Sequence, residues 1–461
     1  MSNRTNVEIP RIGMLEKLGF GTFSTASNVV FNFKDLFYLF FLTNVMGLRI
    51  DHAGIITAVG IVWDAINDPL VGYWAVNHSF RNGEKCRPFA FWCAVPWAIT
   101  VVLMFTCFDV AYGFKFAIAI AIYFLFELFN TFAAIPYNSM GSLATNRDAD
   151  RRAINVARNL GGCVGSGIGA VALYPLLGLF GGLDANGNVD PGDAGRQAFV
   201  YAAMVMGFIC ILGSFAHYFT TKERVKQESA DESKLSIVQV FKILFHCRSW
   251  VVNMLYIICY GTLNLLIMSC INYYATYVLG SASAATPIMA VFLVMSVVST
   301  LVSIPVDKAL GRRNTMILGA AIYMVGKLWF VFDPYSMGAI YVNGITVAIS
   351  MSFAFVLFNT NRNNIADLLE WQSGRRIDTL VSTCDNLASK LSKAGVNLLM
   401  TDALAAAGFN AELPAQPQSA IDTICALLGW VPMIVAALML VIAIFHPIEK
   451  EMAAMKADRE K

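Results

Sequence analysis

Long apolar runs separated by short polar breaks are the main pattern of this chain. Each run is long enough to cross the hydrocarbon core of a bilayer, which takes about 20 residues of helix at about 1.5 Å per residue. We therefore predict an all-α membrane protein of twelve transmembrane helices, at residues 18–46, 54–77, 88–108, 113–140, 153–179, 197–220, 248–279, 285–306, 314–333, 338–359, 377–404 and 420–445.

The composition agrees with a membrane protein. Of the 461 residues, 57% are hydrophobic and 14% are charged, whereas soluble domains carry about 25% charged residues. The net charge of +2 gives no reason to expect nucleic acid as a partner. The partner that the composition indicates is the lipid bilayer itself.

The sequence carries no motif of an enzyme: it contains no P-loop, no HExxH and no GxSxG. The ten cysteines lie mostly inside apolar runs, without a CxxC pair or a Cys/His metal spacing, and we interpret them as packing residues. The glycine-rich stretch Gly161–Gly169 lies within an apolar run, where small residues favour close helix packing over nucleotide binding. We expect neither enzymatic activity nor an organic cofactor.

The distribution of lysine and arginine predicts which side of the membrane the termini face. Of the 33 such residues, 26 lie in the two tails, in the even-numbered gaps between helices and at the helix ends beside them. The odd-numbered gaps hold three, Arg49, Lys115 and Arg196. Because cytoplasmic loops are enriched in basic residues, we predict a multi-pass protein of the cell (inner) membrane with both termini in the cytoplasm.

The longest charged break, Thr221–Lys234, separates six predicted helices from six. Each half also has a basic turn with a glycine after its second helix, at Arg81–Pro88 and Asp307–Arg313. Matching turns in both halves indicate two related six-helix bundles that rock about a central site. The predicted organisation is an N-terminal bundle at 1–220, a cytoplasmic linker at 221–247, and a C-terminal bundle with a cytoplasmic tail at 248–461.

The strongest candidate chemistry lies in the second predicted helix. Asp64, Asn67 and Asp68 are spaced three and four residues apart, so their side chains share one helical face. One aspartate near the middle of a bilayer costs about 2.5–3.5 kcal/mol, so two of them require a compensating partner. A bound cation is the simplest partner and indicates cation-coupled transport. A shared proton or a salt bridge with a lysine are the alternatives.

Five segments then match a known family: WDAINDPLVGYW at 63–74, GEKCRP at 83–88, Ile135–Tyr137, Arg158–Gly162 and EWQSGRR at 370–376. The chain resembles the glycoside–pentoside–hexuronide:cation symporters, the melibiose permease-like family of the major facilitator fold. The resemblance implies that Asp64, Asn67 and Asp68 ligate the coupling cation, with Thr131 on the fourth helix as a hydroxyl ligand. It favours sodium, and it leaves lithium and a proton open.

The sequence departs from the sugar-binding pattern of the melibiose type. That type has an aspartate early in helix one, where this chain has Ala26 or Asn28, depending on the position of a two-residue gap. The helix-four aspartate is replaced by Ala134, and the tryptophan one turn later by Asn138. Two carboxylates that hold galactoside hydroxyls are therefore missing, and a galactoside substrate is not assumed.

Polar residues in the interior of helices one, four, five and eleven are the predicted lining of a substrate cavity. By the resemblance, Arg158 matches the pocket arginine of helix five, Lys390 the lysine of helix eleven, and Asp385 a pocket position. Lys34 and Asp35 are adjacent, so they point about 100° apart and each needs its own partner. The predicted substrate-binding residues are Asn28, Lys34, Asp35, Glu127, Asn138, Arg158, Asp385, Asn386 and Lys390.

We interpret the chain as a symporter that moves a glycoside, pentoside or hexuronide together with a monovalent cation by alternating access, and we expect it to act as a monomer. Loss of two acids with retention of Arg158, Lys390 and Lys393 suggests an anionic sugar such as a uronide. Asp35, Glu127 and Asp385 argue against that version, because they restore acidic groups. The alternatives are a proton-coupled carrier of another substrate class, such as an amphiphile, and a membrane sensor that transports nothing.

Overall fold

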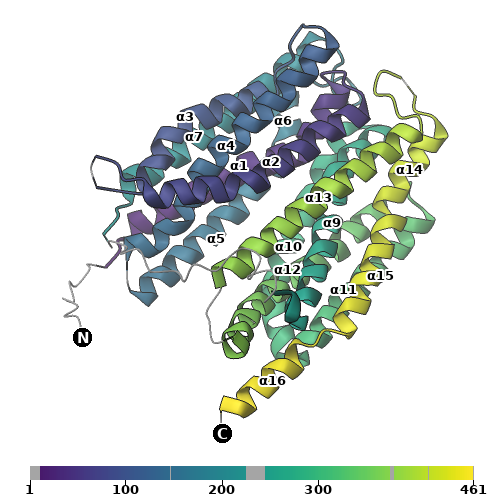
Figure 1. The fold of residues 1–461 in the computed structure, drawn as a ribbon. Coiled ribbons are helices and arrows are strands. Elements are labelled where there is room, and N and C mark those ends of the chain that lie inside the picture. Colours follow the sequence, from purple (N-terminus) through teal and green to yellow (C-terminus); the bar gives the residue numbers. More distant parts are fainter. Residues whose placement is uncertain are drawn as a thin grey trace. The chain divides into compact units, whose positions relative to one another are not determined.

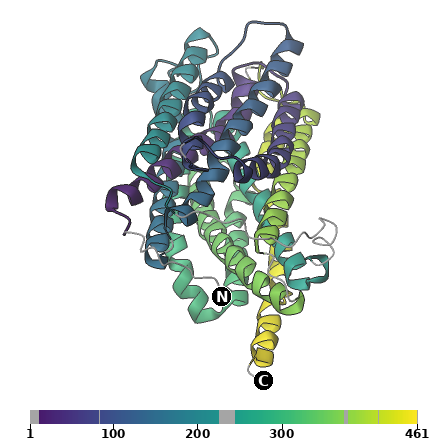
Figure 2. The same ribbon diagram turned by 60° about the vertical axis from the view of Figure 1, so that its left-hand side comes forward.

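The computed structural model describes residues 11–81, 83–145, 147–224, 244–373, 378–413 and 415–459. Over these residues the regular secondary structure is helical, and one isolated antiparallel bridge joins Leu183 and Val189. Figure 1 labels the helices, and Figure 2 shows them from a second side. The predicted all-α class is confirmed for this part of the chain.

The chain divides into two compact units, each of which is described by itself. The N-terminal unit comprises Met1–Phe41, Trp63–Asp184 and Val189–Asp231. The C-terminal unit comprises Leu42–Val62, Ala185–Asn188 and Glu232–Lys461. The division passes through the second helix, so the acidic stretch that begins at Trp63 belongs to the N-terminal unit.

Seven helices lie wholly or partly in the N-terminal unit: α1 (Met14–Asn44), α2 (Ile50–Asn77), α3 (Arg87–Met104), α4 (Tyr112–Ala144), α5 (Asp148–Val171), α6 (Leu173–Leu179) and α7 (Asp193–Thr220). Helix α3 packs against both α4 and α7. Aromatic rings fill the interior of this unit, and the ring centroids of Phe23 on α1 and Tyr137 on α4 lie 4.2 Å apart. The Tyr137 hydroxyl also donates to the Phe20 carbonyl over 2.7 Å, which fixes α4 against α1.

Helix α5 packs unusually closely against α1. Gly161, Gly165 and Gly169 follow one another at one-turn spacing and face the α1 backbone. A Cβ atom built on Gly165 would lie 2.2 Å from the carbonyl oxygen of Thr25, and the other two glycines meet α1 carbonyls at 2.1 and 2.3 Å. Only glycine permits this approach, so the predicted packing role of the Gly161–Gly169 stretch is confirmed.

The described helices of the C-terminal unit are α9 (Arg248–Tyr277), α10 (Ala285–Leu310), α11 (Arg312–Phe332), α12 (Met337–Ser373), α13 (Asp378–Ala406), α14 (Gln418–Leu428), α15 (Trp430–Ile444) and α16 (Ile448–Arg459), with a short 3₁₀ turn at Ala282–Ala284. Helix α12 packs against α10 and α11, and α9 packs against α13 and α15. A buried apolar cluster that includes Trp250, Leu368 and Ile448 joins α9, α12 and α16.

Within the described residues, nine helical stretches are long and apolar enough to cross a membrane. The pair α5–α6 is bent by 50° at its break and adds a tenth if it is one span. Helices α1 and α13 coincide with two more predicted spans but are not among these nine stretches. Both carry charged residues in their interior, Lys34 and Asp35 in α1 and Lys390 and Lys393 in α13. The count of twelve spans stays a prediction.

The last predicted span is broken in two at Gly429, between α14 and α15. In an unbroken helix the Leu428 carbonyl would accept a hydrogen bond from residue 432, but Pro432 has no N–H to donate. The ammonium group of Lys327, on α11, donates to this carbonyl instead. Lys327 is fully buried, and its side chain therefore supplies the donor that the proline removes.

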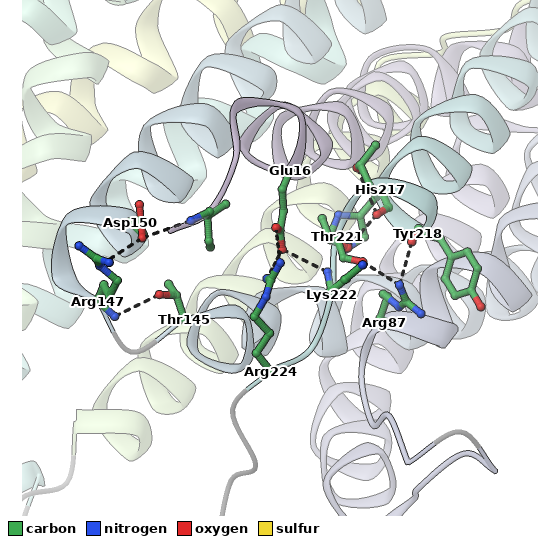
Figure 3. Close-up of polar contacts among 12 residues, drawn as sticks. Glu16, Arg87, Thr145, Arg147, Asp150, His217, Tyr218, Thr221, Lys222 and Arg224 are labelled. Carbon is green, nitrogen blue, oxygen red and sulfur yellow. Dashed lines mark hydrogen bonds and ion pairs between the residues drawn. The ribbon is translucent and has the colours of Figure 1, made fainter. Parts of the chain in front are cut away.

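The start of the predicted linker is tied to the helix ends of the N-terminal unit (Figure 3). The Arg224 guanidinium forms two hydrogen bonds with the Glu16 carboxylate, of 2.7 and 2.9 Å. Arg87 donates to the Thr221 carbonyl over 2.7 Å. The Glu223 carboxylate accepts three backbone N–H groups at the N-terminus of α3, at 2.6–2.9 Å. Residues 221–224 are thus held in place, and residues 225–243 lie outside the described chain.

Candidate functional site

The structure brings the four predicted cation ligands together at the interface of α2 and α4. Asp64, Asn67 and Asp68 lie on one face of α2, and Thr131 lies on α4. The Thr131 hydroxyl oxygen is 3.5 Å from Oδ1 of Asp64 and 3.3 Å from Oδ1 of Asp68. The two carboxylates therefore converge on one hydroxyl group, which is itself buried.

Two further contacts fix the register of α2 against α4. The indole N–H of Trp63 donates to the Phe124 carbonyl over 3.2 Å, and the two rings stack with centroids 5.0 Å apart. One turn later, the buried Asn67 amide donates through Nδ2 to the Glu127 carbonyl over 3.3 Å. Because the nitrogen of Asn67 is engaged with the backbone, the oxygen of this amide is the atom that can ligate a cation.

The donor set suits a hard monovalent cation. It consists of two carboxylates, one amide oxygen and one hydroxyl oxygen, all within two turns of α2 and one position on α4. Pro69 has no N–H, so the Ala65 carbonyl also lacks its usual helical donor. Oxygen donors of this kind are those that sodium and lithium prefer, whereas softer metals favour nitrogen and sulfur.

Three of the predicted substrate-binding residues contact one another beside this set. The Lys34 ammonium lies 2.7 Å from Oε1 of Glu127 and 3.1 Å from Oδ1 of Asp35. The side chains of Lys34 and Glu127 are 6% and 1% exposed, so this ion pair is shielded from solvent. The expectation that Lys34 and Asp35 need separate partners is wrong, because the flexible stem of the lysine reaches back to its neighbour.

Asn28 and Arg158 lie where α1, α4 and α5 meet. The Arg158 guanidinium stacks over the Tyr137 ring at 4.1 Å and donates to the Tyr137 carbonyl. Its Nε is buried and has no hydrogen-bond partner among the described residues. The Asn28 amide donates to the Ser24 carbonyl and accepts from the Ser166 hydroxyl on α5 over 3.4 Å. Asn138 is exposed on α4.

The helix-one alternative to Asn28 packs elsewhere. Ala26 is buried against Gly213 of α7, where a Cβ atom on the glycine would lie 2.5 Å from that of Ala26. It therefore contributes to the contact between two helices. Of the two candidate positions, Asn28 is the one that presents a polar group toward α5.

The remaining predicted residues lie on α13 in the C-terminal unit. The carboxylate of Asp385 is completely buried and accepts from the Arg362 guanidinium of α12 over 2.9 Å. Asn386 is exposed, and Lys390 is half-buried one turn further along. Part of the EWQSGRR segment at 370–376, residues 374–376, lies outside the described chain.

Comparison with known proteins identifies the family. The model of the "MFS/sugar transport protein" family matches residues 19–450 of this chain. The chain belongs to this family. The resemblance to the glycoside–pentoside–hexuronide:cation symporters is confirmed, since the curated relatives of the chain are symporters and sugar transporters of that kind. This family member is a multi-pass membrane transporter and not an enzyme.

Two relatives and one solved structure illustrate the match. The isoprimeverose transporter of Lactiplantibacillus pentosus is 25% identical, covering 97% of this chain and 91% of its own. The inner membrane symporter YicJ of Escherichia coli (strain K12) is 26% identical, and the match covers 94% of this chain and 91% of YicJ. A bacterial homolog of the human lysosomal transporter Spinster, in an inward-facing conformation, superposes with a TM-score of 0.68 at 14% identity over 96% of both chains. This last likeness shows the fold alone.

Sequence reasoning missed several polar residues of this family member. Asn32 donates to Ser166 over 3.1 Å and so extends the contact between α1 and α5. The Tyr123 hydroxyl oxygen accepts a hydrogen bond from the Lys34 ammonium over 3.2 Å, and the Arg362 guanidinium forms an ion pair with the Asp385 carboxylate. The spacing of Asn28 and Asn32, one helical turn, was a signal that points to a shared polar face. The partners of Lys34 and Asp385 depend on contacts between helices that no local pattern encodes.

Proposed function

We propose that this transporter is a symporter that couples the uptake of a sugar to a monovalent cation by alternating access. The observation that supports this most directly is the convergence of Asp64 and Asp68 on the Thr131 hydroxyl, with Asn67 beside them. Two carboxylates within an apolar helix are costly, and an exchangeable cation bound between them lowers that cost. The cation in turn raises the affinity for the sugar, and the sugar raises the affinity for the cation by the same factor.

Sodium is the proposed coupling ion. The all-oxygen donor set supports an alkali cation, and lithium is its closest competitor. Proton coupling would require the two carboxylates to share a proton, and then Asn67 and Thr131 would have no direct role as ligands. The dependence of uptake on Asn67 and Thr131 therefore separates the two kinds of coupling.

The proposed substrate is a glycoside, pentoside or hexuronide, in line with the sugar after which the isoprimeverose transporter of Lactiplantibacillus pentosus is named. Amide and guanidinium groups offer the paired donors and acceptors that sugar hydroxyls need. We assign substrate contact to Asn28, Asn138 and Arg158 of the N-terminal unit, and Asn386 and Lys390 on α13 stay predicted substrate-binding residues.

An anionic sugar is favoured within this class. The acids that argued against it are each engaged with a basic side chain: Asp35 and Glu127 with Lys34, and Asp385 with Arg362. Arg158 keeps a buried Nε without a partner among the described residues, so it retains a donor for a carboxylate. Uptake of neutral glycosides without any uptake of uronides would reject this version.

The experiment is uptake into membrane vesicles of a panel of neutral and anionic glycosides, under an imposed sodium gradient and then a proton gradient. We expect Asp64→Asn or Asp68→Asn to abolish cation-stimulated uptake while the protein remains in the membrane. Asp51→Asn is the matched control, since Asp51 begins the same helix and pairs with the exposed Arg49. Normal accumulation by the Asp64 and Asp68 variants would reject the proposed ligands.

A further inference from the structure

A second pair of carboxylates lies next to the candidate cation site, and it already holds a cation of the protein itself. Oδ1 of Asp35 and Oε1 of Glu127 lie 3.1 and 2.7 Å from the same nitrogen, the Nζ of Lys34. The other Glu127 oxygen accepts from the Asn130 amide over 3.1 Å, which orients the carboxylate. The ammonium is therefore bound by two acids from two helices, α1 and α4.

The rest of the surroundings is also that of an ammonium receptor. The rings of Phe31, Tyr123 and Phe126 lie with their centroids 4.8, 5.1 and 5.4 Å from Nζ of Lys34. Ring faces at such distances attract an ammonium group through their quadrupoles, and cages of this kind bind alkylammonium ligands. The Tyr123 hydroxyl adds an oxygen at 3.2 Å.

This cluster shares a helix and a hydrogen bond with the candidate cation site. Glu127 and Thr131 are one turn apart on α4, and the carbonyl of Glu127 accepts from Asn67. The N-terminal unit thus contains two neighbouring pairs of acids, Asp35 with Glu127 and Asp64 with Asp68. The first pair is bridged by a lysine ammonium, and the second converges on a hydroxyl.

We propose that Asp35 and Glu127 form a second cation site in which the Lys34 ammonium is the permanent occupant. When Lys34 is replaced by alanine, we expect this site to bind a small primary ammonium ion. This second site then holds α1 and α4 together beside the candidate cation site. Its residues Lys34, Asp35 and Glu127 do not contact the sugar. One consequence rests on the proposed function: the carrier has one exchangeable cation site and one that is built in.

The test is chemical rescue of Lys34→Ala in the purified full-length protein. This variant removes the ammonium and leaves both carboxylates, so we expect methylammonium chloride to raise its thermal unfolding midpoint saturably by a few degrees relative to equal potassium chloride. The wild type should show no such difference, because its site is filled. The matched control Lys34→Ala/Glu127→Gln lacks one carboxylate and should also show none.

Each outcome decides the proposal. Absence of a methylammonium effect on Lys34→Ala, or an equal effect on the wild type or the double variant, overturns it. If Lys34→Ala does not accumulate in the membrane, Lys34→Ala/Asp35→Asn/Glu127→Gln must restore accumulation, since no cation is then required; continued absence of that triple variant also overturns the proposal.

The titration needs no sugar and no gradient, so its result is independent of whether the protein is a symporter. If sodium symport also holds, Lys34→Ala should make the sodium dependence of uptake steeper, because a second exchangeable site is exposed. A positive titration with unchanged uptake kinetics would support the built-in site and contradict its link to transport.

Discussion

Thr131 joins the carboxylates of Asp64 and Asp68 across the interface between α2 and α4. Its β-branched side chain has few rotamers in a helix, so the position of its hydroxyl is set largely by the backbone of α4. The hydrogen bond from Asn67 to the Glu127 carbonyl holds that backbone one turn earlier. The candidate cation site therefore depends on the register of two helices and not only on its acids.

Removal of the Thr131 hydroxyl tests this residue directly. We expect Thr131→Ala to raise the sodium concentration for half-maximal uptake by about tenfold or more, since a polar contact to a charged partner contributes about 1.5–3 kcal/mol. Thr131→Ser keeps the hydroxyl and should stay within a few-fold of wild type. Equal sodium dependence of Thr131→Ala and wild-type vesicles would show that the hydroxyl is not a ligand.

At this scale the sequence predicts what lies on one helix and misses what lies between helices. The shared face of Asp64, Asn67 and Asp68 follows from helical periodicity. Thr131 entered only through the family resemblance, because its partners lie more than 60 residues away in the chain. The pairing of Lys34 with Glu127 was missed for the same reason, since it depends on how α1 packs against α4.

The packing of α1 against α5 is the element-scale feature that glycine makes possible. Gly165 faces the Thr25 carbonyl so closely that a methyl group has no room, whereas nothing lies within 4 Å of a Cβ atom built on Gly167. These two glycines belong to the same helix and differ only in the face they occupy. They therefore form a matched pair for measuring the contact.

We expect Gly165→Ala to lower the thermal unfolding midpoint of the purified protein, because overpacking a helix interface costs about 1–3 kcal/mol. Gly167→Ala should be neutral or stabilising by about 1 kcal/mol at most, the difference in helix propensity between alanine and glycine. The comparison is made by thermal unfolding in detergent. A Gly165→Ala variant as stable as Gly167→Ala would refute the close α1–α5 contact.

The break between α14 and α15 gives a second prediction for an element. Lys327→Met removes the donor to the Leu428 carbonyl and leaves this buried group without a hydrogen bond, which costs about 1–3 kcal/mol. Adding Pro432→Ala supplies a backbone N–H to the same carbonyl and should recover most of the loss. Thermal unfolding of the single and double variants tests this. Failure of Pro432→Ala to restore stability would assign Lys327 another role.

The positions of the helices could be predicted from the hydrophobic runs, and their interruptions could not. The predicted run 420–445 is split at Gly429, and the run 153–179 is split after Val171. Helix α12 continues to Ser373, although the predicted span ends at residue 359. Its last turns are polar and are helical all the same. Hydropathy measures whether a segment suits a bilayer, and it does not report bends or helices that extend past the membrane.

For the whole molecule, the two units and the family fit a carrier with a cation site in its N-terminal unit. Thr221–Arg224, at the start of the predicted linker, are bonded to the ends of α1 and α3 (Figure 3). The backbone N–H of Arg224 also donates to the Leu143 carbonyl near the end of α4. Composition predicts that this segment leaves the membrane, and that stays a prediction. It could not show the contacts, because the Glu16 and α3 backbone partners are distant in sequence.

The central claim is that an exchangeable cation at Asp64 and Asp68 is coupled to sugar movement. The most direct measurement is sodium entry into vesicles driven by an inward gradient of a transported sugar, with no sodium gradient imposed. Because coupling is reciprocal, the sugar gradient should drive sodium into wild-type vesicles and not into vesicles carrying Asp64→Asn, while Asp51→Asn behaves as wild type. Sugar entry without sodium entry in the wild type, or undiminished sodium entry in the Asp64 variant, would contradict the account.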